Sequence, residues 1–277
     1  MREKWTPHII AVNALVVFIV LGLACASAPE GTVAQEVRQD NNEKDFEFDW
    51  DGYGKGNIVI TKYIGSKKEV HIPASIQNNP VTSIGRGYGR TYQPFKDCKS
   101  ITSVTIPDSV TIIGDRAFEG CTSLTSINIP DSVTSIDFYA FHETAWLNNQ
   151  PEGVVYIDKW AYTYKGTMPA NTKITLLDGT KGIAGGAFRG DNCNNLTSVT
   201  IPASVISIGD HAFMNFNYNL TSVTFQGKNT IVNDGFFGNL RQKYLAGGPG
   251  TYIVTEKHSV SDVGDDVIGQ PKVWTKK

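Results

Sequence analysis

One short phrase recurs along this chain, and the recurrence restricts the fold more than any other feature. It reads ITSVTIPDSVTIIGDRAF at 101–118, LTSINIPDSVTSIDFYAF at 124–141 and LTSVTIPASVISIGDHAF at 196–213. Repetition at a period of roughly 20 to 50 residues is typical of chains that fold by stacking one small unit. Because a single copy cannot bury its own apolar side, the copies must share a continuous core.

The apolar positions of the phrase form a frame that identifies weaker copies. Each clear copy holds an aliphatic residue, a second one two positions later, a third one further on and a phenylalanine, as in Val104, Ile106, Ile113 and Phe118. Three more segments keep this frame, which predicts six rungs over residues 69–239. The other frame residues are Val70, Ile72, Ile84 and Phe95; Ile127, Ile129, Ile136 and Phe141; Ile174, Leu176, Ile183 and Phe188; Val199, Ile201, Ile208 and Phe213; and Val223, Phe225, Val232 and Phe237.

Each rung is predicted to contain two extended pieces and one turn. Alternation of apolar residues at the start of a copy indicates a short half-buried strand. Pro107, Pro130 and Pro202 are expected at the ends of these strands, because proline cannot donate to a sheet. The Ser-Val-Thr-Ser-Ile piece is expected to run along a second wall, and Gly-Asp-x-Ala-Phe indicates one helical turn capped by the aspartate.

The recurring run L-T-S-V-T-I-P-x-S-V-T-S-I-G-x-x-A-F-x-G-C-x-S, carried by 101–123, 124–141 and 196–213, resembles the BspA-like leucine-rich repeats of bacterial cell-surface proteins. Its Ile-Pro, Ala-Phe and Cys recur in register. The resemblance implies an α/β-type leucine-rich repeat solenoid, dominated by short parallel β-strands with short helical turns. It also implies a non-catalytic module that binds proteins, such as host matrix or cell-surface proteins, and so mediates adhesion. A structural envelope spacer without a specific ligand is the alternative.

Residues 1–26 predict an export signal. A basic start precedes an apolar run over 9–23, which is long for a signal core and shorter than the ~20 residues that span a membrane. Two interpretations of its end stay open. Ala-Cys-Ala at 24–26 fits ordinary cleavage, whereas Leu-Ala-Cys at 23–25 resembles a lipobox in which Cys25 is lipidated and anchors the protein to a membrane.

The remaining segments complete the predicted organisation. Residues 27–48 are polar and charged, which favours a tether. Residues 49–68 predict an N-terminal β cap that covers the first rung. An inserted β-hairpin is expected at about 150–166, and residues 240–277 are expected to form a C-terminal tail or cap.

Composition and motifs argue against most other functions. The formal net charge is −2 and the basic residues are scattered, which disfavours a nucleic-acid partner. The dispersed histidines and the absence of the common catalytic motifs predict that the protein is not an enzyme and needs no cofactor. Asp49, Asp51 and Gly52 match only the opening of a calcium loop, so no metal is expected.

Three cysteines share one slot of the repeat. Cys98, Cys121 and Cys193 each lie three residues before the first apolar residue of a rung, and Asn217 takes that slot in another copy. A position that accepts either cysteine or asparagine is expected to be a buried one, where a small side chain meets turn backbone. The spacing of these cysteines does not suit zinc.

The outward side of the first strands carries small polar residues. Alternation places a row on one face, with a second row of Glu69, Ser103, Ser126, Lys173, Ser198 and Ser222 beside it. Two interpretations stay open: β-formers that fill a solvated sheet, or a surface that binds an extended partner through many hydrogen bonds. On the second interpretation, the candidate binding residues are His71, Thr105, Asn128, Thr175, Thr200 and Thr224.

The hairpin segment VVYIDKWAYTY offers a second candidate contact. A turn at Asp158-Lys159 would pair Ile157 with Trp160 and Val155 with Tyr162, so that these four residues share one face. That face is expected either to pack on the solenoid or to serve as an aromatic contact site. Tyr156 is placed on the opposite face as a candidate binding residue. The recurring phenylalanines should form a single buried column: Phe118, Phe141, Phe188 and Phe213.

Overall fold

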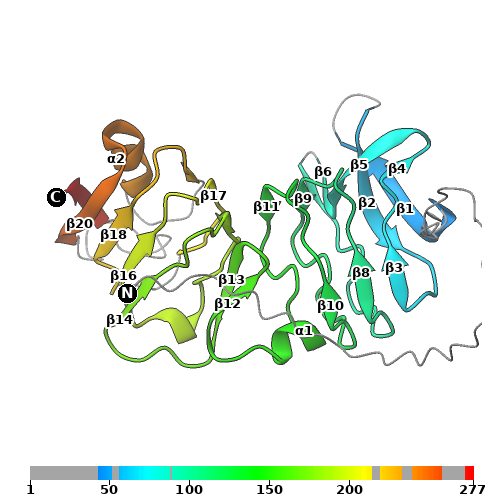
Figure 1. The fold of residues 1–277 in the computed structure, drawn as a ribbon, viewed down its shortest axis with the longest axis horizontal. Helices are drawn as coiled ribbons and strands as arrows, with labels where there is room; N and C mark the ends of the chain where they lie inside the picture. The colour runs from blue at the N-terminus through cyan, green and yellow to red at the C-terminus, as the bar shows by residue number, and fades with distance from the viewer. Residues whose placement is uncertain (1–42, 52–55, 88, 214–218, 233–238, 258–271) are drawn as a thin grey trace, which may run out of the picture. The chain divides into compact units, whose positions relative to one another are not determined.

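The computed structural model describes residues 43–51, 56–87, 89–213, 219–232, 239–257 and 272–277 (Figure 1). The predicted export signal with Cys25, most of the predicted tether and Phe237 lie outside these residues. Tertiary contacts divide the chain after Arg38, and every described residue belongs to the part that starts at Gln39. The following concerns that part alone.

The first strands of all six predicted rungs are present and form the first wall (Figure 1). They pair in parallel within two separate sheets, with the predicted register. Val70 pairs with Val104 and Val104 with Ile127 in one sheet, and Val199 pairs with both Ile174 and Val223 in the other. The strands are β3 (Glu69–His71), β8 (Ser103–Thr105) and β10 (Ser126–Ile127), then β14 (Thr172–Thr175), β16 (Leu196–Ile201) and β18 (Ser222–Phe225).

The second extended piece of each rung forms a second wall, as predicted. In three copies the carbonyl of the proline that ends the first strand accepts the N–H three residues later, as Pro107 does from Val110 (3.0 Å), and this turn carries the chain across. Ile113 pairs with Ile84 and Ile136 in register. The strands are β5 (Asn79–Ile84), β9 (Ile112–Ile113) and β11 (Ser135–Ile136), then β15 (Gly182–Ile183), β17 (Ser207–Ile208) and β19 (Ile231–Val232).

The Gly-Asp-x-Ala-Phe segment is not a helical turn, so that local prediction is wrong. Arg116 has a φ of 54°, which interrupts any helix. Its N–H donates to the carbonyl of Phe138 in the next rung (2.9 Å), and the N–H of Phe118 donates to Ala140 (2.8 Å). The neighbouring rung lies within hydrogen-bond reach of these amides, so the backbone forms a third ladder between rungs. Only single three-residue turn bonds run along the segment itself, such as that from the N–H of Ala117 to the carbonyl of Gly114 (3.3 Å).

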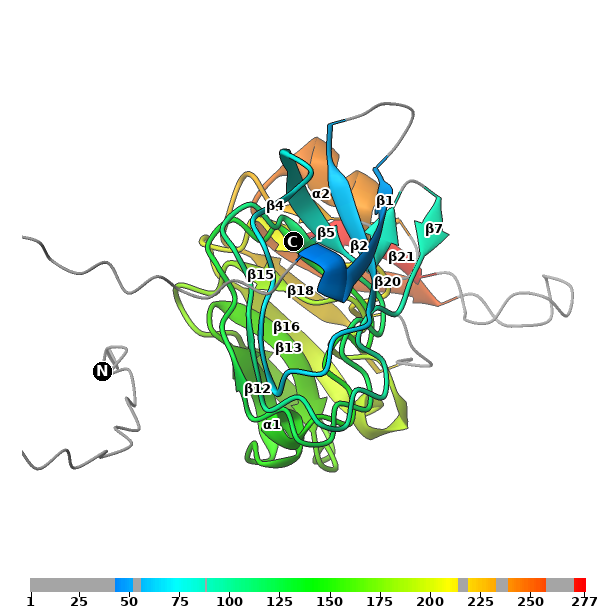
Figure 2. The ribbon, with the colours of Figure 1, turned by 90° about the vertical axis from the view of Figure 1, so that its right-hand side faces the viewer.

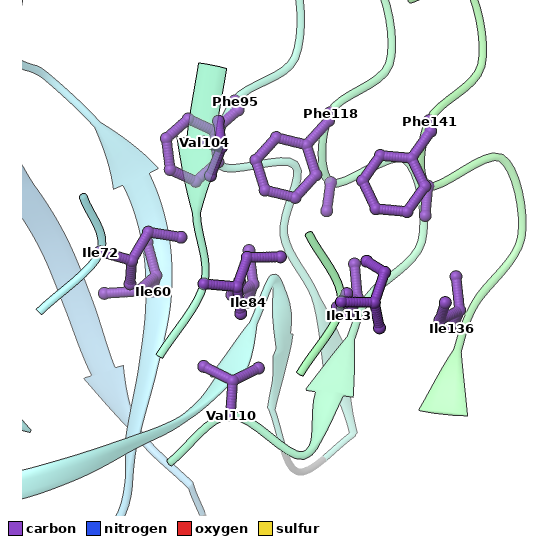
Figure 3. Packing of buried hydrophobic residues seen from close by; sticks show 14 of the residues in the cluster. Ile60, Ile72, Ile84, Phe95, Val104, Val110, Ile113, Phe118, Ile136 and Phe141 are labelled. Carbon is purple, nitrogen blue, oxygen red and sulfur yellow. The ribbon is translucent and has the colours of Figure 1, made fainter. Parts of the chain in front are cut away.

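Ring stacking fills the core behind this third ladder (Figure 3). Phe118 lies between Phe95 and Phe141, with ring centroids 4.7 and 5.3 Å away and interplanar angles of 18° and 9°. Phe188 and Phe213 stack separately at 5.0 Å. The prediction of one continuous column is therefore wrong, because the hairpin separates two columns.

The hairpin is part of the second wall. After α1 (Ala145–Asn148), strands β12 (Gly153–Ile157) and β13 (Trp160–Lys165) pair antiparallel, and β13 runs parallel to β15. Ile157 pairs with Trp160 as predicted. The pairing of Val155 with Tyr162 is wrong: a bulge after Val155 shifts the register, and Val155 pairs with Thr163.

The two faces of the hairpin contact two different hydrophobic clusters. Ile157, Trp160 and Tyr162 pack into the cluster of the N-terminal rungs, whereas Ala161 packs into that of the C-terminal rungs. All four predicted face residues, Val155 included, are buried, which confirms packing on the solenoid. A Cβ at Gly182 would lie 2.3 Å from the Trp160 ring, so this pairing requires a glycine.

Both ends of the stack carry β-structure. At the N-terminal end, β1 (Phe46–Trp50) pairs antiparallel with β2 (Ile58–Tyr63), which runs parallel to β5; β1 starts ahead of the predicted boundary at residue 49. Figure 2 shows β1 and β2 in front of the repeats. At the C-terminal end, β20 (Gly250–Lys257) pairs antiparallel with both β18 and β21 (Lys272–Lys276), and α2 (Leu240–Gly247) packs nearby. The remaining short elements are η1 (Glu43–Asp45), β4 (Ser75–Ile76), β6 (Arg86–Gly87), β7 (Arg90–Thr91) and η2 (Asp191–Cys193).

Candidate binding surface

The outward polar residues of the first wall are divided between its two sheets, one at the N-terminal rungs and one at the C-terminal rungs. The first row, here called the N-terminal stripe, holds Glu69, His71, Ser103, Thr105, Ser126 and Asn128. His71 lies directly beside Thr105 in the sheet, and Ser103 beside Ser126. Asn128 follows the end of β10 and is exposed, whereas His71 and Thr105 are half-buried.

The second row, here called the C-terminal stripe, holds Lys173, Thr175, Ser198, Thr200, Ser222 and Thr224. Thr200 pairs with Thr175 on one side and with Thr224 on the other. Strand β20 adds Thr251 to this row, with its hydroxyl oxygen 2.9 Å from that of Thr224. Thr251 lies outside the repeat frame, so the sequence pattern did not identify it.

The two stripes belong to different sheets, because β10 and β14 do not pair. In two other rungs the amide at this slot donates to the next rung: the N–H of Ile72 to the carbonyl of Thr105 (3.0 Å) and that of Leu176 to Thr200 (3.1 Å). The N–H of Ile129 instead donates to the Asp158 carboxylate at the hairpin tip (2.7 Å). Asp158 therefore replaces the missing carbonyl and ends the first sheet.

Tyr156 does not lie free on the hairpin. Its ring packs against the C-terminal cluster, and its hydroxyl accepts the N–H of Leu177 (3.1 Å). Burial raises the pKa of this phenol. Part of the side chain is consequently used for packing, and the role of Tyr156 in binding stays a prediction.

A cavity of about 260 Å³ lies at the hairpin tip. It is lined by Asp131, Asp158, Lys159 and Lys181 among others. The Lys159 ammonium lies 2.8 Å from the Asp131 carboxylate, and a hydrogen bond from Lys159 lowers the pKa of that carboxyl. Lys181 donates to the carbonyls of Asp131 and Val133. The Lys159 ammonium thus joins the hairpin to a rung, and the Lys181 ammonium joins two rungs to each other.

A second polar cluster joins the turns of separate rungs. The Arg86 guanidinium lies 3.0 Å from both carboxylate oxygens of Asp137, which also accepts the Ser135 hydroxyl (2.8 Å). Burial raises the pKa of Asp137, and Arg86 opposes that rise. Asp49 is similarly occupied by Tyr92 (2.8 Å). Among the described residues, no group of three or more His, Cys, Asp or Glu side chains is arranged to hold a metal ion.

The slot shared by the cysteines is internal, as predicted. Cys121 and Cys193 are buried and Cys98 is half-buried. The Cys121 thiol donates to the carbonyl of Phe95 in the preceding turn (3.0 Å), so this small side chain does meet turn backbone.

The repeats account for more than half of the chain. The profile described as "BspA type Leucine rich repeat region" matches residues 91–172 and 155–245, with six copies. This chain belongs to the BspA-type leucine-rich repeat family. It is a family of bacterial surface proteins. No curated protein matches the sequence.

Solved structures similar to this BspA-type chain are also leucine-rich repeat proteins. One from T. pallidum is 24% identical, with a TM-score of 0.41, over 74% of this chain and 90% of that one. One from Bacteroides ovatus is 20% identical, with a TM-score of 0.33, over 70% and 67%. A leucine rich cell surface protein from Faecalibacterium prausnitzii is 19% identical, with a TM-score of 0.26, over 69% and 77%.

Another set of hydroxyls in the BspA-type repeats is structural. The threonine that follows the first apolar residue of a copy donates to a carbonyl of the preceding rung, as from Thr197 to Thr172 (2.9 Å). The other donors at this slot are Thr102, Thr125 and Thr221. These threonines hold the rungs together, which distinguishes them from the outward residues of the two stripes. No helix among the described residues is long and apolar enough to cross a membrane.

Proposed function

We propose that this chain is an exported bacterial surface protein that binds other proteins, such as host matrix or cell-surface proteins, and catalyses no reaction. The proposal rests mainly on the stripes. Thr175, Thr200 and Thr224 repeat at the ~4.8 Å spacing of neighbouring strands. The stacked rungs fix the positions of these hydroxyls, so less conformational entropy is lost when a partner binds them.

The protein-binding interpretation also agrees with how the rest of the molecule uses its polar groups. The charged side chains in the cavity at the hairpin tip are paired with one another or with backbone. A catalytic site would require a pocket with convergent polar groups that are available to a substrate. The stripes instead present a surface over several rungs, which suits a macromolecular partner.

The test compares one large charge in each stripe with the same charge on the other wall. Thr105→Arg and Thr200→Arg should each change the free energy of unfolding by at most ~0.5 kcal/mol. The double variant should bind immobilised matrix or cell-surface proteins about tenfold more weakly, because two guanidinium groups then crowd a neutral surface. Ile206→Arg is the control on the other wall, since the Ile206 side chain is 41% exposed beside β17.

Surface plasmon resonance on purified protein measures these affinities. Unchanged binding by the folded double variant would exclude the stripes as the contact surface. Absence of saturable binding by wild type would favour the spacer function.

Export has a separate test: mass spectrometry of the native protein should find an N-terminus near Cys25 or Ser27, with a diacylglycerol adduct if Cys25 is lipidated. Retention of Met1 on the native protein would contradict export.

A further inference from the structure

Two of the cysteines occupy equivalent positions on adjacent turns. Cys98 and Cys121 each follow the core phenylalanine of their turn by three residues. The backbones before them are paired, with the N–H of Phe95 donating to Ala117 (2.9 Å) and that of Asp97 to Glu119 (2.8 Å). The two cysteines therefore begin from neighbouring, in-register segments.

The two residues also meet at one atom. The carbonyl oxygen of Phe95 accepts the Cys121 thiol at 3.0 Å and the backbone N–H of Cys98 at 3.0 Å. Both side chains border the N-terminal hydrophobic cluster. The Cys121 sulfur consequently lies close to the backbone of Cys98.

We propose that Cys98 and Cys121 form a disulfide bond that links these adjacent turns when the protein folds in an oxidising compartment. Paired segments lie ~4.8 Å apart, which falls within the ~4.4 to 6.8 Å between Cα atoms that a disulfide spans. The inference concerns a modification site and does not depend on the proposed binding function.

The chemistry requires a disulfide-bearing oxidant, such as oxidised glutathione. The thiolate of Cys98, the more exposed of the two, attacks one sulfur of the oxidant and releases the other as a thiol. The thiolate of Cys121 then attacks the Cys98 sulfur of this mixed disulfide and releases the second thiol. Two protein thiols lose two electrons and two protons, and the oxidant is reduced to two thiols.

Burial also affects when the bond can form. It raises the pKa of Cys121 to about 12, with the neighbouring Cys98 contributing, so little of the attacking thiolate exists while the turns are packed. We therefore expect the bond to form during folding, and to resist reduction once the core has closed over it.

Cys193 is the internal control. It is buried in the C-terminal cluster, and the same slot of the next copy holds Asn217 instead of a second cysteine. Adjacent copies therefore pair Cys98 with Cys121 but leave Cys193 without an equivalent partner.

The experiment refolds the full chain in a buffer of reduced and oxidised glutathione, alkylates the free thiols and maps the peptides by mass spectrometry. We expect a Cys98–Cys121 linked peptide, lighter by about 2 Da than the two thiol peptides together, and alkylated Cys25 and Cys193. The oxidised protein should melt about 5 °C or more above the reduced one.

Cys98→Ser should abolish both the linked peptide and the melting difference, whereas Cys193→Ser should retain them. Recovery of alkylated Cys98 and Cys121 from folded wild type would overturn the proposal. A bond from either cysteine to Cys25 or Cys193, or to a second chain, would overturn it as well. The decisive measurement is made on wild type, so it does not depend on whether a variant folds.

Discussion

Replacement of Phe118 by alanine should destabilise the protein strongly, and the N-terminal rungs more than the C-terminal ones. The Phe118 side chain is 0% exposed and stacks on a ring on each side, Phe95 at 4.7 Å and Phe141 at 5.3 Å. Truncation of a buried phenylalanine typically costs ~3 to 5 kcal/mol, because the apolar contacts are lost and a cavity remains. Each stacked pair contributes ~0.5 to 1.5 kcal/mol beyond buried area, which places this site near the top of that range.

Urea unfolding followed by circular dichroism measures the change in the free energy of unfolding. A loss of ~4 kcal/mol corresponds to a decrease of about 10 °C in melting temperature for a body of this size. Ile231→Ala is the matched control, because that side chain is 65% exposed and its truncation should cost at most ~0.5 kcal/mol.

Hydrogen exchange shows where the destabilisation is felt. Phe118 belongs to the N-terminal cluster, and the hairpin separates that cluster from the C-terminal one. Amides of β8 and β9 should lose protection more than those of β16 and β17. An effect no larger than that of Ile231→Ala would refute the stacked core. Equal loss of protection in both halves would refute the division by the hairpin.

Two further substitutions test the hairpin and the buried thiols. Gly182→Ala should cost ~1 to 3 kcal/mol of unfolding free energy, because the new methyl group would lie 2.3 Å from the Trp160 ring. In a Trp160→Ala background this loss of stability should largely disappear. An equal loss in both backgrounds would exclude the clash. Burial raises the pKa of Cys193 to about 12, above the ~8.5 of an unfolded thiol. The unfolded chain therefore loses this proton first. The free energy of unfolding should decrease as pH rises from about 8.5 towards 12, by up to ~1.4 kcal/mol per pH unit. Urea unfolding of reduced protein at pH 7.5 and 10 should show a smaller decrease for Cys193→Ala than for wild type, and identical decreases would contradict the buried thiol.

The sequence by itself determined the repeat and its register. The alternation of apolar and polar residues predicts which side chains point inward, and a repeated frame requires equivalent residues of successive rungs to stack. This is why the first strands of all six rungs were predicted correctly, with partners such as Val104 and Val199. The half-buried Ile127 departs from the buried frame because β10 has no next rung on the first wall.

Only the tertiary structure decided where the hairpin lies. Its strands fit an insertion equally well, and their pairing with β15 depends on a contact between Trp160 and Gly182, which lie in different segments. The sequence does hold a signal, since Gly182 occupies a position that is serine in several other copies, such as Ser135. A glycine at this position indicates that another side chain packs closely against it, but the sequence does not identify that side chain as Trp160. The hairpin's position gives two phenylalanine columns and two polar stripes in place of one of each, and it follows from long-range packing that no local pattern encodes.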